Sequence, residues 1–175
     1  MKAILRLLFA FFFTISVFSV QAQILVPVKW EFKTKVTGNN TAELQFIATI
    51  DQGWHLYSQD LPDGGPMPTE FKFEKTNGIE LVGKASEPKP EEVFDEMFQM
   101  KVKYFSRLAT FTQKIKITGN QPVKVSGTIN YQACNDETCT PGESEFTFDV
   151  PAVTAQSQPA EVKTENLPSP GADTL

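Results

Sequence analysis

A two-residue alternation of apolar and polar side chains constrains the fold of this chain more than any other feature of its sequence. In the longest run, VKVSGTINY, one face carries Val123, Val125, Gly127, Ile129 and Tyr131. Successive side chains of a β-strand point to opposite sides, so this pattern predicts a strand with one buried face. The same alternation occurs at residues 28–36, 42–50, 71–73, 100–104, 115–117 and 146–150.

Turn-forming residues separate these stretches. Roughly eight or nine short strands at this spacing predict an all-β fold, an immunoglobulin-like β-sandwich, with a small closed barrel as the alternative. Between Glu91 and Phe98 the pattern allows a helical turn, and no long helix is expected. Gly, Asn and Asp favour tight turns, and they cluster at residues 38–40, 51–53, 63–65, 77–78 and 119–120.

The N-terminal stretch MKAILRLLFAFFFTISVFSVQA, residues 1–22, has the organisation of a secretory signal peptide. A basic head with Lys2 and Arg6 precedes an apolar run over residues 7–20, and small residues follow. We therefore expect a mature chain that begins at Gln23 and a periplasmic location. An uncleaved membrane anchor is the alternative, but the run is shorter than the ~20 residues of a membrane span. No second apolar run follows, so no stable membrane insertion is expected after cleavage.

The rest of the chain divides into one domain, residues 23–150, and a Pro-rich tail, residues 151–175. The tail has no aromatic residue. This composition predicts disorder, because such a segment cannot bury enough apolar surface to offset its ordering entropy. Without Lys2 and Arg6, 14 Lys and Arg face 21 Asp and Glu, a net charge near −7. This charge argues against nucleic-acid binding, which requires a basic surface.

Both cysteines lie in the acidic stretch YQACNDETC, at Cys134 and Cys139. We expect one strand to end at Tyr131 and the next to start near Glu145, which leaves a long hairpin loop over residues 132–143. Three interpretations of the cysteines are open, and the first is a metal site. A structural zinc site needs about four Cys or His ligands, whereas the chain has two Cys and one His. We therefore expect no metal and no cofactor.

A passive disulfide is the second interpretation and a redox-active pair is the third. Two cysteines in a secreted protein usually pair, but a ring this short stabilises a fold by only about 2 kcal/mol in the chain-entropy model. Exchange needs sulfur atoms that a partner's thiolate can reach, as a surface loop allows. Asp136, Glu137 and Glu143 disfavour the thiolate form. Such thiols are typical of a pair that reacts only when a partner has docked.

The stretch INYQACNDETCTPGESEF resembles the active-site hairpin in the N-terminal periplasmic domain of the thiol:disulfide interchange protein DsbD. In that family a Tyr-Gln pair, here Tyr131 and Gln132, leads to the first cysteine, and a Pro-rich turn follows the second. GWHLYS, residues 53–58, and FDEMF, residues 94–98, resemble two further family motifs in the same order. The resemblance covers residues 24–150 and implies an immunoglobulin-like fold.

The resemblance also implies a redox relay of the protein-disulfide reductase type. In the family the cysteine pair accepts electrons from a membrane thiol reductase domain. It passes them to periplasmic thioredoxin-like or isomerase proteins and to cytochrome-maturation proteins. Here the pair is Cys134 and Cys139, with Cys139 as the attacking thiol. The alternatives are an immunoglobulin-like binding or structural module with a passive disulfide, and a non-redox assembly partner of the same fold.

FDEMF is similar to the family's cap loop, which shields the cysteine pair and opens for partners. The resemblance gives that role to Asp95, Glu96, Met97 and Phe98. The cysteine spacing is one residue shorter than in the best-known member, and Met97 replaces its shielding Phe. Met is apolar and adaptable enough to cover a sulfur atom. The membrane and C-terminal thioredoxin-like domains are absent from this sequence, which indicates a stand-alone version or a fragment.

His55 is the single histidine of the chain and lies in WHLY. Alternation places Trp54 and Leu56 on one strand face, and His55 and Tyr57 on the other. One interpretation of His55 is a half-exposed strand residue without a role in chemistry. The resemblance instead places His55 and Tyr57 beside the cysteine loop, where an imidazole could relay a proton during exchange. Tyr131 is expected beside the site as well.

Overall fold

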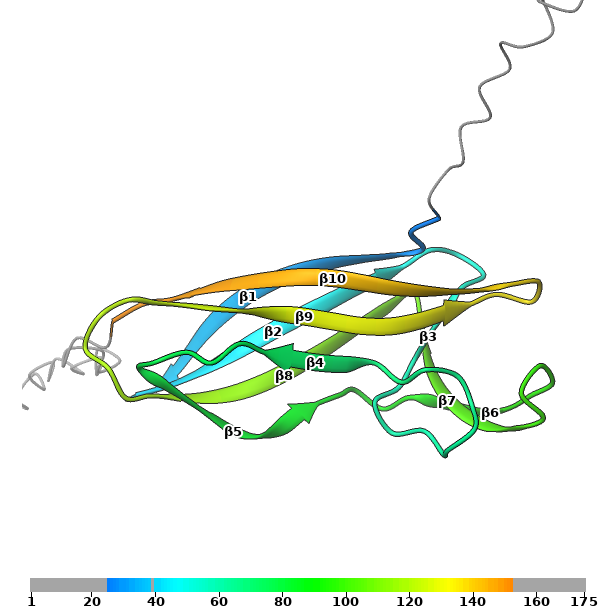
Figure 1. Ribbon diagram of the computed structural model, residues 1–175, viewed down its shortest axis with the longest axis horizontal. Helices are drawn as coiled ribbons and strands as arrows, with labels where there is room; N and C mark the ends of the chain where they lie inside the picture. The colour runs from blue at the N-terminus through cyan, green and yellow to red at the C-terminus, as the bar shows by residue number, and fades with distance from the viewer. Residues whose placement is uncertain (1–24, 39, 153–175) are drawn as a thin grey trace, which may run out of the picture.

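The computed structural model describes residues 25–38 and 40–152. The expected signal peptide, residues 1–22, lies outside the described residues, as does most of the expected tail, residues 153–175. The described part holds no helix that is long and apolar enough to cross a membrane. Its strands (Figure 1) are β1 Val28–Gly38, β2 Thr41–Ile50, β3 His55–Tyr57, β4 Glu70–Phe73, β5 Ile79–Ser86, β6 Glu91–Asp95, β7 Met100–Ser106, β8 Leu108–Ile117, β9 Val123–Cys134 and β10 Cys139–Val150.

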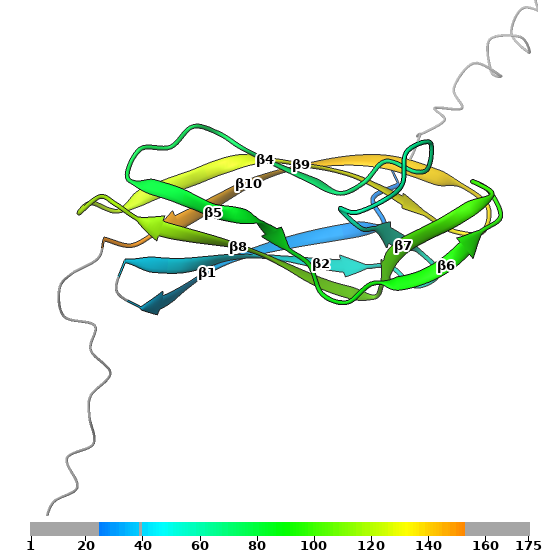
Figure 2. The ribbon, with the colours of Figure 1, turned by 90° about the horizontal axis from the view of Figure 1, so that it is seen from below.

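Two antiparallel sheets pack face to face, and Figure 2 shows the layer of β1, β2 and β8 beneath the layer of β4, β9 and β10. The first sheet has the strand order β1-β2-β8-β5. The second has the order β10-β9-β3-β7-β6, and β4 pairs with β9. The predicted all-β, immunoglobulin-like β-sandwich is therefore confirmed. More strands occur than the sequence indicated, because short strands such as β3 carry too few residues to show an alternation.

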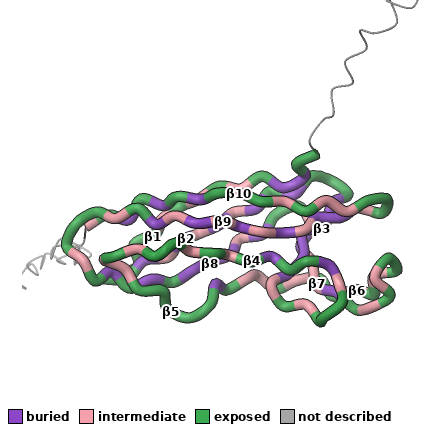
Figure 3. The backbone as a smooth tube through the Cα atoms, in the orientation of Figure 1, coloured by how far each residue is buried: buried purple, intermediate pink, exposed green. Residues whose placement is uncertain are grey.

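The core fills the space between the two sheets. Alternate residues of β2 and β8 are buried, and so are alternate residues of β9, as the purple bands along the tube in Figure 3 show. The ring of Phe46 lies at the centre of an aromatic cluster, with centroid distances of 4.5 Å to Phe71 and 4.9 Å to both Phe146 and Phe148. Such rings contribute much of the apolar area that the fold buries.

Strand β9 connects this core to the cysteines. β10 pairs with one edge of β9 along the whole length of β9. β4 and then β3 pair with the other edge of β9. Tyr131 and Ala133 point into the core, so Cys134 points to the outer face of the sheet. Tyr131 is buried, and its ring centroid lies 5.7 Å from that of Trp30. The structure therefore places Tyr131 in the core and not beside the cysteines.

Candidate functional site

The two cysteines close the hairpin between β9 and β10. Cys134 and Cys139 are direct partners in the strand ladder, and a disulfide joins them with their Cα atoms 4.1 Å apart. The prediction of a loop over residues 132–143 was wrong, because only residues 135–138 lie outside the strands. β10 is an edge strand. An edge strand tolerates Pro141, because the missing N–H can face away from the only neighbouring strand.

Asn135 shapes the short loop between the cysteines. Its backbone N–H donates to the carbonyl oxygen of Thr138 at 2.9 Å. Its side-chain Oδ1 accepts hydrogen bonds from the N–H groups of Glu137, at 2.9 Å, and Thr138, at 2.8 Å. Asn side chains commonly fix turns in this way. Sequence reasoning missed Asn135, although an Asn at the start of a tight turn is a recognisable signal.

The two sulfur atoms differ in exposure. Cys134 is 4% exposed, whereas Cys139 is only partly buried. The Nε2 atom of Gln132 lies 3.7 Å from the Cys134 sulfur, and the Oε1 atom of the same amide accepts a 2.7 Å hydrogen bond from the Met67 N–H. Gln132 thus adds to the cover over Cys134. A thiolate from a partner protein has readier access to Cys139 than to Cys134.

The cap is the tip of the hairpin formed by β6 and β7. Its turn, residues 96–99, connects two paired strands and does not form the helical turn that the sequence allowed. The Oδ1 atom of Asp95 accepts hydrogen bonds from the N–H groups of Met97, at 2.8 Å, and Phe98, at 3.2 Å. A single carboxylate oxygen therefore holds the first half of the turn in shape.

Met97 brings the cap into contact with the disulfide. Its Sδ atom lies 3.5 Å from the Sγ atom of Cys139, although the residue is 54% exposed. Phe98 is partly buried, and its ring meets that of Tyr57 edge-on at a centroid distance of 6.2 Å. Figure 1 shows the tips of the β6–β7 and β9–β10 hairpins at the same end of the sandwich. The cap thus contacts both the cysteine hairpin and β3.

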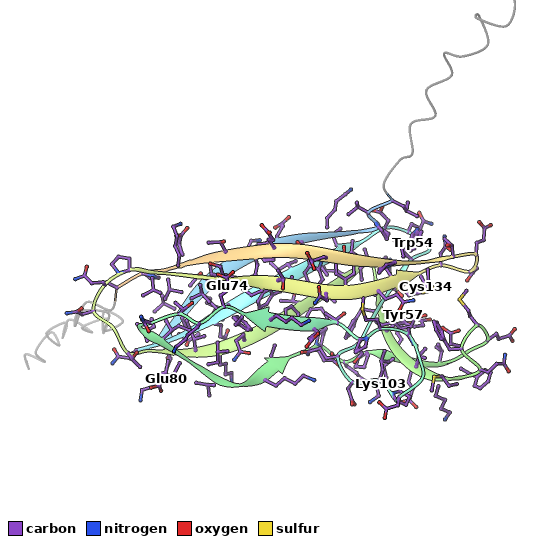
Figure 4. The ribbon with its side chains drawn as sticks, viewed as in Figure 1. Trp54, Tyr57, Glu74, Glu80, Lys103 and Cys134 are labelled. Carbon is purple, nitrogen blue, oxygen red and sulfur yellow. A yellow bond between two sulfur atoms is a disulfide. The ribbon has the colours of Figure 1, made fainter. Side chains whose placement is uncertain are left out.

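Tyr57 links β3 to the cap through its hydroxyl, which donates a 2.9 Å hydrogen bond to Oδ2 of Asp95. Tyr57 is buried, and this burial, with a contribution from the Asp95 carboxylate, raises its pKa well above the ordinary value. The neutral hydroxyl therefore remains a donor at physiological pH. Figure 4 shows Tyr57 and Cys134 at one end of the molecule, far from Glu74 and Glu80 at the other.

His55 lies beside Cys134 in the neighbouring strand. The two residues are ladder partners, and His55 and Tyr57 share the face that carries Cys134. The imidazole Nδ1 lies 3.2 Å from the Ser106 hydroxyl, and the ring stacks on Tyr104 with centroids 4.1 Å apart. Sequence reasoning missed Tyr104 and Ser106, because no local signal relates β7 to the cysteines.

An acidic cleft of about 380 Å³ lies between the cap and the cysteine hairpin. Its lining includes Asp95 and Glu96 from the cap hairpin and Asp136 from the loop, and none of the described lining residues is Lys or Arg. Carboxylates near a thiol disfavour its thiolate form. The acidic surroundings expected from the loop sequence therefore extend to the cap.

The structure gathers most of the predicted site residues at this end of the sandwich, and only Tyr131 lies elsewhere. Among the described residues, no group of three or more His, Cys, Asp and Glu side chains is arranged to hold a metal ion. The residues brought together are Cys134, Cys139, His55, Tyr57, Asp95, Glu96, Met97 and Phe98.

Several solved structures are similar to this chain. The N-terminal periplasmic domain of ScsB from Proteus mirabilis matches with a TM-score of 0.56 at 12% identity, over 76% of this chain and 51% of that one. This chain thus spans about half the length of that ScsB chain. The reduced DsbD N-terminal domain of Neisseria meningitidis has a TM-score of 0.45 at 19% identity, over 70% of this chain and 85% of that one. A complex of the Neisseria meningitidis DsbD and PilB N-terminal domains has a TM-score of 0.47 at 19% identity, over 78% of this chain and 96% of that one.

The family relationship comes from the sequence as a whole. No curated protein matches the chain. The family model described as "Thiol:disulfide interchange protein DsbD, N-terminal" matches residues 21–151, which include the cap and the disulfide. The molecule is thus a thiol–disulfide exchange domain with one cysteine pair, and the chain belongs to the family of DsbD N-terminal domains.

Proposed function

We propose that this domain relays electrons in the periplasm from a membrane thiol reductase to the disulfides of thioredoxin-like or isomerase proteins, through Cys134 and Cys139. One observation carries the proposal: the disulfide lies at a hairpin tip, with one sulfur atom buried and the other partly exposed beneath a cap. The family description supports exchange chemistry. The apolar run at residues 7–20 supports export from the cytoplasm.

The position of the disulfide favours exchange over a purely stabilising role. It joins two residues that already pair at the end of a long strand ladder, and both belong to the same sheet. In the chain-entropy model, closing so short a ring stabilises a fold by only about 2 kcal/mol. A bond between the two sheets would constrain the fold more. Stabilisation is therefore a poor explanation for this pair.

Reduction of the domain begins at Cys139. A thiolate of the reductase attacks the Cys139 sulfur, the disulfide breaks, and Cys134 leaves as a thiolate that takes up a proton. We assign the supply of that proton to His55, and its position as the ladder partner of Cys134 supports this role. A second reductase thiolate then attacks the reductase sulfur of the mixed disulfide and releases Cys139 as a thiolate, which takes up a proton from solvent. Two electrons and two protons have then passed to the pair.

The second half-reaction returns the domain to its oxidised form. The Cys139 thiolate attacks the disulfide of the acceptor and forms a mixed disulfide, and one acceptor sulfur leaves as a thiolate. Cys134, deprotonated as it reacts, then attacks the Cys139 sulfur, which restores the Cys134–Cys139 bond and releases the acceptor as a dithiol. The net change is the reduction of one acceptor disulfide by two electrons.

The cap limits this chemistry to docked partners. Met97 contacts the sulfur atom that partners must reach, so the cap has to move before a thiolate can approach. Asp95 holds the cap turn and also accepts the Tyr57 hydrogen bond, so Glu96, Met97 and Phe98 move as one unit. The carboxylates of the cleft disfavour the thiolate form of the reduced cysteines. Together these features slow reactions with stray oxidants.

A defined acceptor tests the proposal. The reduced protein is mixed with a purified thioredoxin-fold domain in its disulfide form, and thiol transfer is followed by alkylation and gel shift. We expect complete transfer of two electrons. Cys134→Ser, which retains Cys139, should accumulate a one-to-one mixed disulfide. Cys139→Ser is the matched control, and it should trap far less because its remaining thiol is buried.

Two outcomes would overturn parts of the proposal. If neither the wild type nor either variant reacts with the acceptor, the disulfide is passive and the domain is a binding or structural module. If Cys139→Ser traps as much mixed disulfide as Cys134→Ser, exchange stands but the assignment of Cys139 as the attacking thiol is wrong.

A further inference from the structure

Three sulfur atoms from two hairpins meet beside the acidic cleft. Cys134 and Cys139 are bonded across β9 and β10, and the Sδ atom of Met97 reaches the Cys139 sulfur at 3.5 Å from the cap. Thiolate and thioether sulfurs are soft ligands that select soft metal ions, Cu(I) above all when a thioether takes part. A count of Cys and His alone overlooks this set, because the third ligand is a methionine.

We propose that the reduced domain binds one Cu(I) ion through the sulfur atoms of Cys134, Cys139 and Met97. A metal–sulfur bond is about 2.3 Å long, so a planar three-sulfur site has sulfur atoms about 4 Å apart. Met97 and Cys139 already lie close to that separation. The cysteines are direct ladder partners on one face of the sheet, so reduction lets their sulfur atoms separate without any change in strand register.

The carboxylates near the three sulfur atoms attract a cation, and the soft sulfur ligands select which cation binds. Asp95, Glu96 and Asp136 line the cleft, and their carboxylates attract a positive ion while they resist the build-up of free thiolate. Cu(I) binding displaces one proton from each thiol, and the ion offsets part of the charge that results. Hard cations prefer oxygen ligands, and zinc takes about four ligands in a tetrahedral arrangement.

His55 is the histidine beside the sulfur atoms, as the ladder partner of Cys134. Its Nδ1 lies against the Ser106 hydroxyl and its ring packs on Tyr104, which fixes the position of the ring. The proposed ligand set is the three sulfur atoms, and a nitrogen neighbour in the X-ray absorption data would add His55 to it. Copper occupancy and thiol–disulfide exchange exclude each other, because the ion holds both thiolates and the disulfide offers no thiolate. This inference does not depend on which partners the domain reduces.

Competition with a chromogenic Cu(I) chelator under anaerobic conditions tests the inference. The reduced wild-type protein should bind one Cu(I), and X-ray absorption at the copper edge should show three sulfur neighbours. Met97→Leu keeps an apolar cap without the ligand. We expect it to bind Cu(I) at least about tenfold more weakly, since even residues outside the ligand shell contribute about 10–100-fold to metal affinity, and to show two sulfur neighbours.

Controls separate the site from general copper binding by thiols. Met67→Leu removes another exposed thioether, from the segment between β3 and β4, and should bind like the wild type. The double variant that carries both Cys134→Ser and Cys139→Ser should not bind one Cu(I) per protein. Equal affinity and equal sulfur counts for the wild type and Met97→Leu would overturn the three-sulfur site. If the wild type bound no more Cu(I) than the double serine variant, the proposed copper binding would be wrong altogether.

Discussion

The hydroxyl of Tyr57 donates a 2.9 Å hydrogen bond to Oδ2 of Asp95 and so joins β3 to the base of the cap. The other oxygen of the same carboxylate holds the cap turn through the N–H groups of Met97 and Phe98. The position of the cap over the disulfide therefore depends on one carboxylate with three hydrogen bonds.

Tyr57→Phe should loosen the cap. A hydrogen bond to a charged group contributes about 1.5–3 kcal/mol, so we expect a small thiol to reduce the disulfide about tenfold faster in this variant. Stopped-flow or gel-shift kinetics would measure the rate. Tyr104→Phe is the matched control, because its hydroxyl lines the same cleft without a hydrogen bond to any described residue. Equal rates in the wild type and Tyr57→Phe would show that this hydrogen bond does not hold the cap.

Alkylation of the reduced protein should proceed in a fixed order. Cys139 is partly exposed and Cys134 is buried, with Gln132 beside it. Iodoacetamide reacts with the accessible thiolate, so mass spectrometry of partly modified protein should find the label on Cys139 first. Gln132→Ala should expose Cys134 further and so reduce the difference between the alkylation rates of the two cysteines. Label that appears first on Cys134 would contradict the proposed roles of the two sulfur atoms.

Stability should fall at alkaline pH. Burial is the first cause that raises the pKa of Tyr57, Tyr104 and Tyr131, and nearby carboxylates add to it for Tyr57 and Tyr104. In the unfolded chain tyrosine ionises near pH 10. The stability that these residues contribute is therefore complete below about pH 10 and is lost as the pH rises further. Urea unfolding between about pH 8 and pH 11 should show Tyr57→Phe losing less stability than the wild type. If the free energy of unfolding fell equally with pH in the wild type and in Tyr57→Phe, this would argue against a raised pKa for Tyr57.

Gly142→Ala should disturb the cysteine hairpin. Gly142 is the ladder partner of Tyr131, and a Cβ atom added there would lie 2.2 Å from Cζ of that ring. Overpacking of this kind costs about 1–3 kcal/mol, which urea unfolding would detect. Gly38→Ala is the control, since its added Cβ meets only Thr41 Oγ1 at 3.5 Å. Unchanged stability in Gly142→Ala would mean that β10 can move away from Tyr131 freely.

The reduction potential should fall in the range of exchange proteins. Structural disulfides of secreted proteins lie below roughly −300 mV, whereas thioredoxins and glutaredoxins lie at roughly −270 to −200 mV. Equilibration with glutathione buffers should place the Cys134–Cys139 pair in the second range. A value below roughly −300 mV would support a passive disulfide instead.

The alternation of side chains predicted most of the fold, because the two faces of a strand are a local property of the sequence. It predicted β2 and the core half of β9, and it placed His55 and Tyr57 together on one face. It ended β9 at Tyr131 and not at Cys134, and it started β10 near Glu145 and not at Cys139, where Pro141 and the acidic residues around it are typical of a loop. An edge strand accepts such residues, and the position of β10 at the edge follows from the arrangement of the whole sheet.

Site residues could be predicted where a local sequence motif marks them. The cysteine pair was singled out from its spacing and acidic surroundings, and the cap residues were identified by resemblance to a family. Tyr104 and Ser106 were missed because they reach the site only through the pairing of β3 with β7. Tyr131 was expected beside the site with the Tyr-Gln pair of the family motif, but three residues along a strand lead to the opposite face of the sheet.

Strand β9 carries core residues on one face and the reactive sulfur on the other. If Cys134 slid along the sheet, Tyr131 would have to leave its place beside Trp30, so the sulfur has the rigidity of the core. The cap, in contrast, is held mainly by one carboxylate, one edge-on ring contact and one sulfur contact. The disulfide thus sits on a strand anchored in the core, whereas few contacts hold the segment over it, so substitutions in that segment can change access to the sulfur atoms without repacking the core.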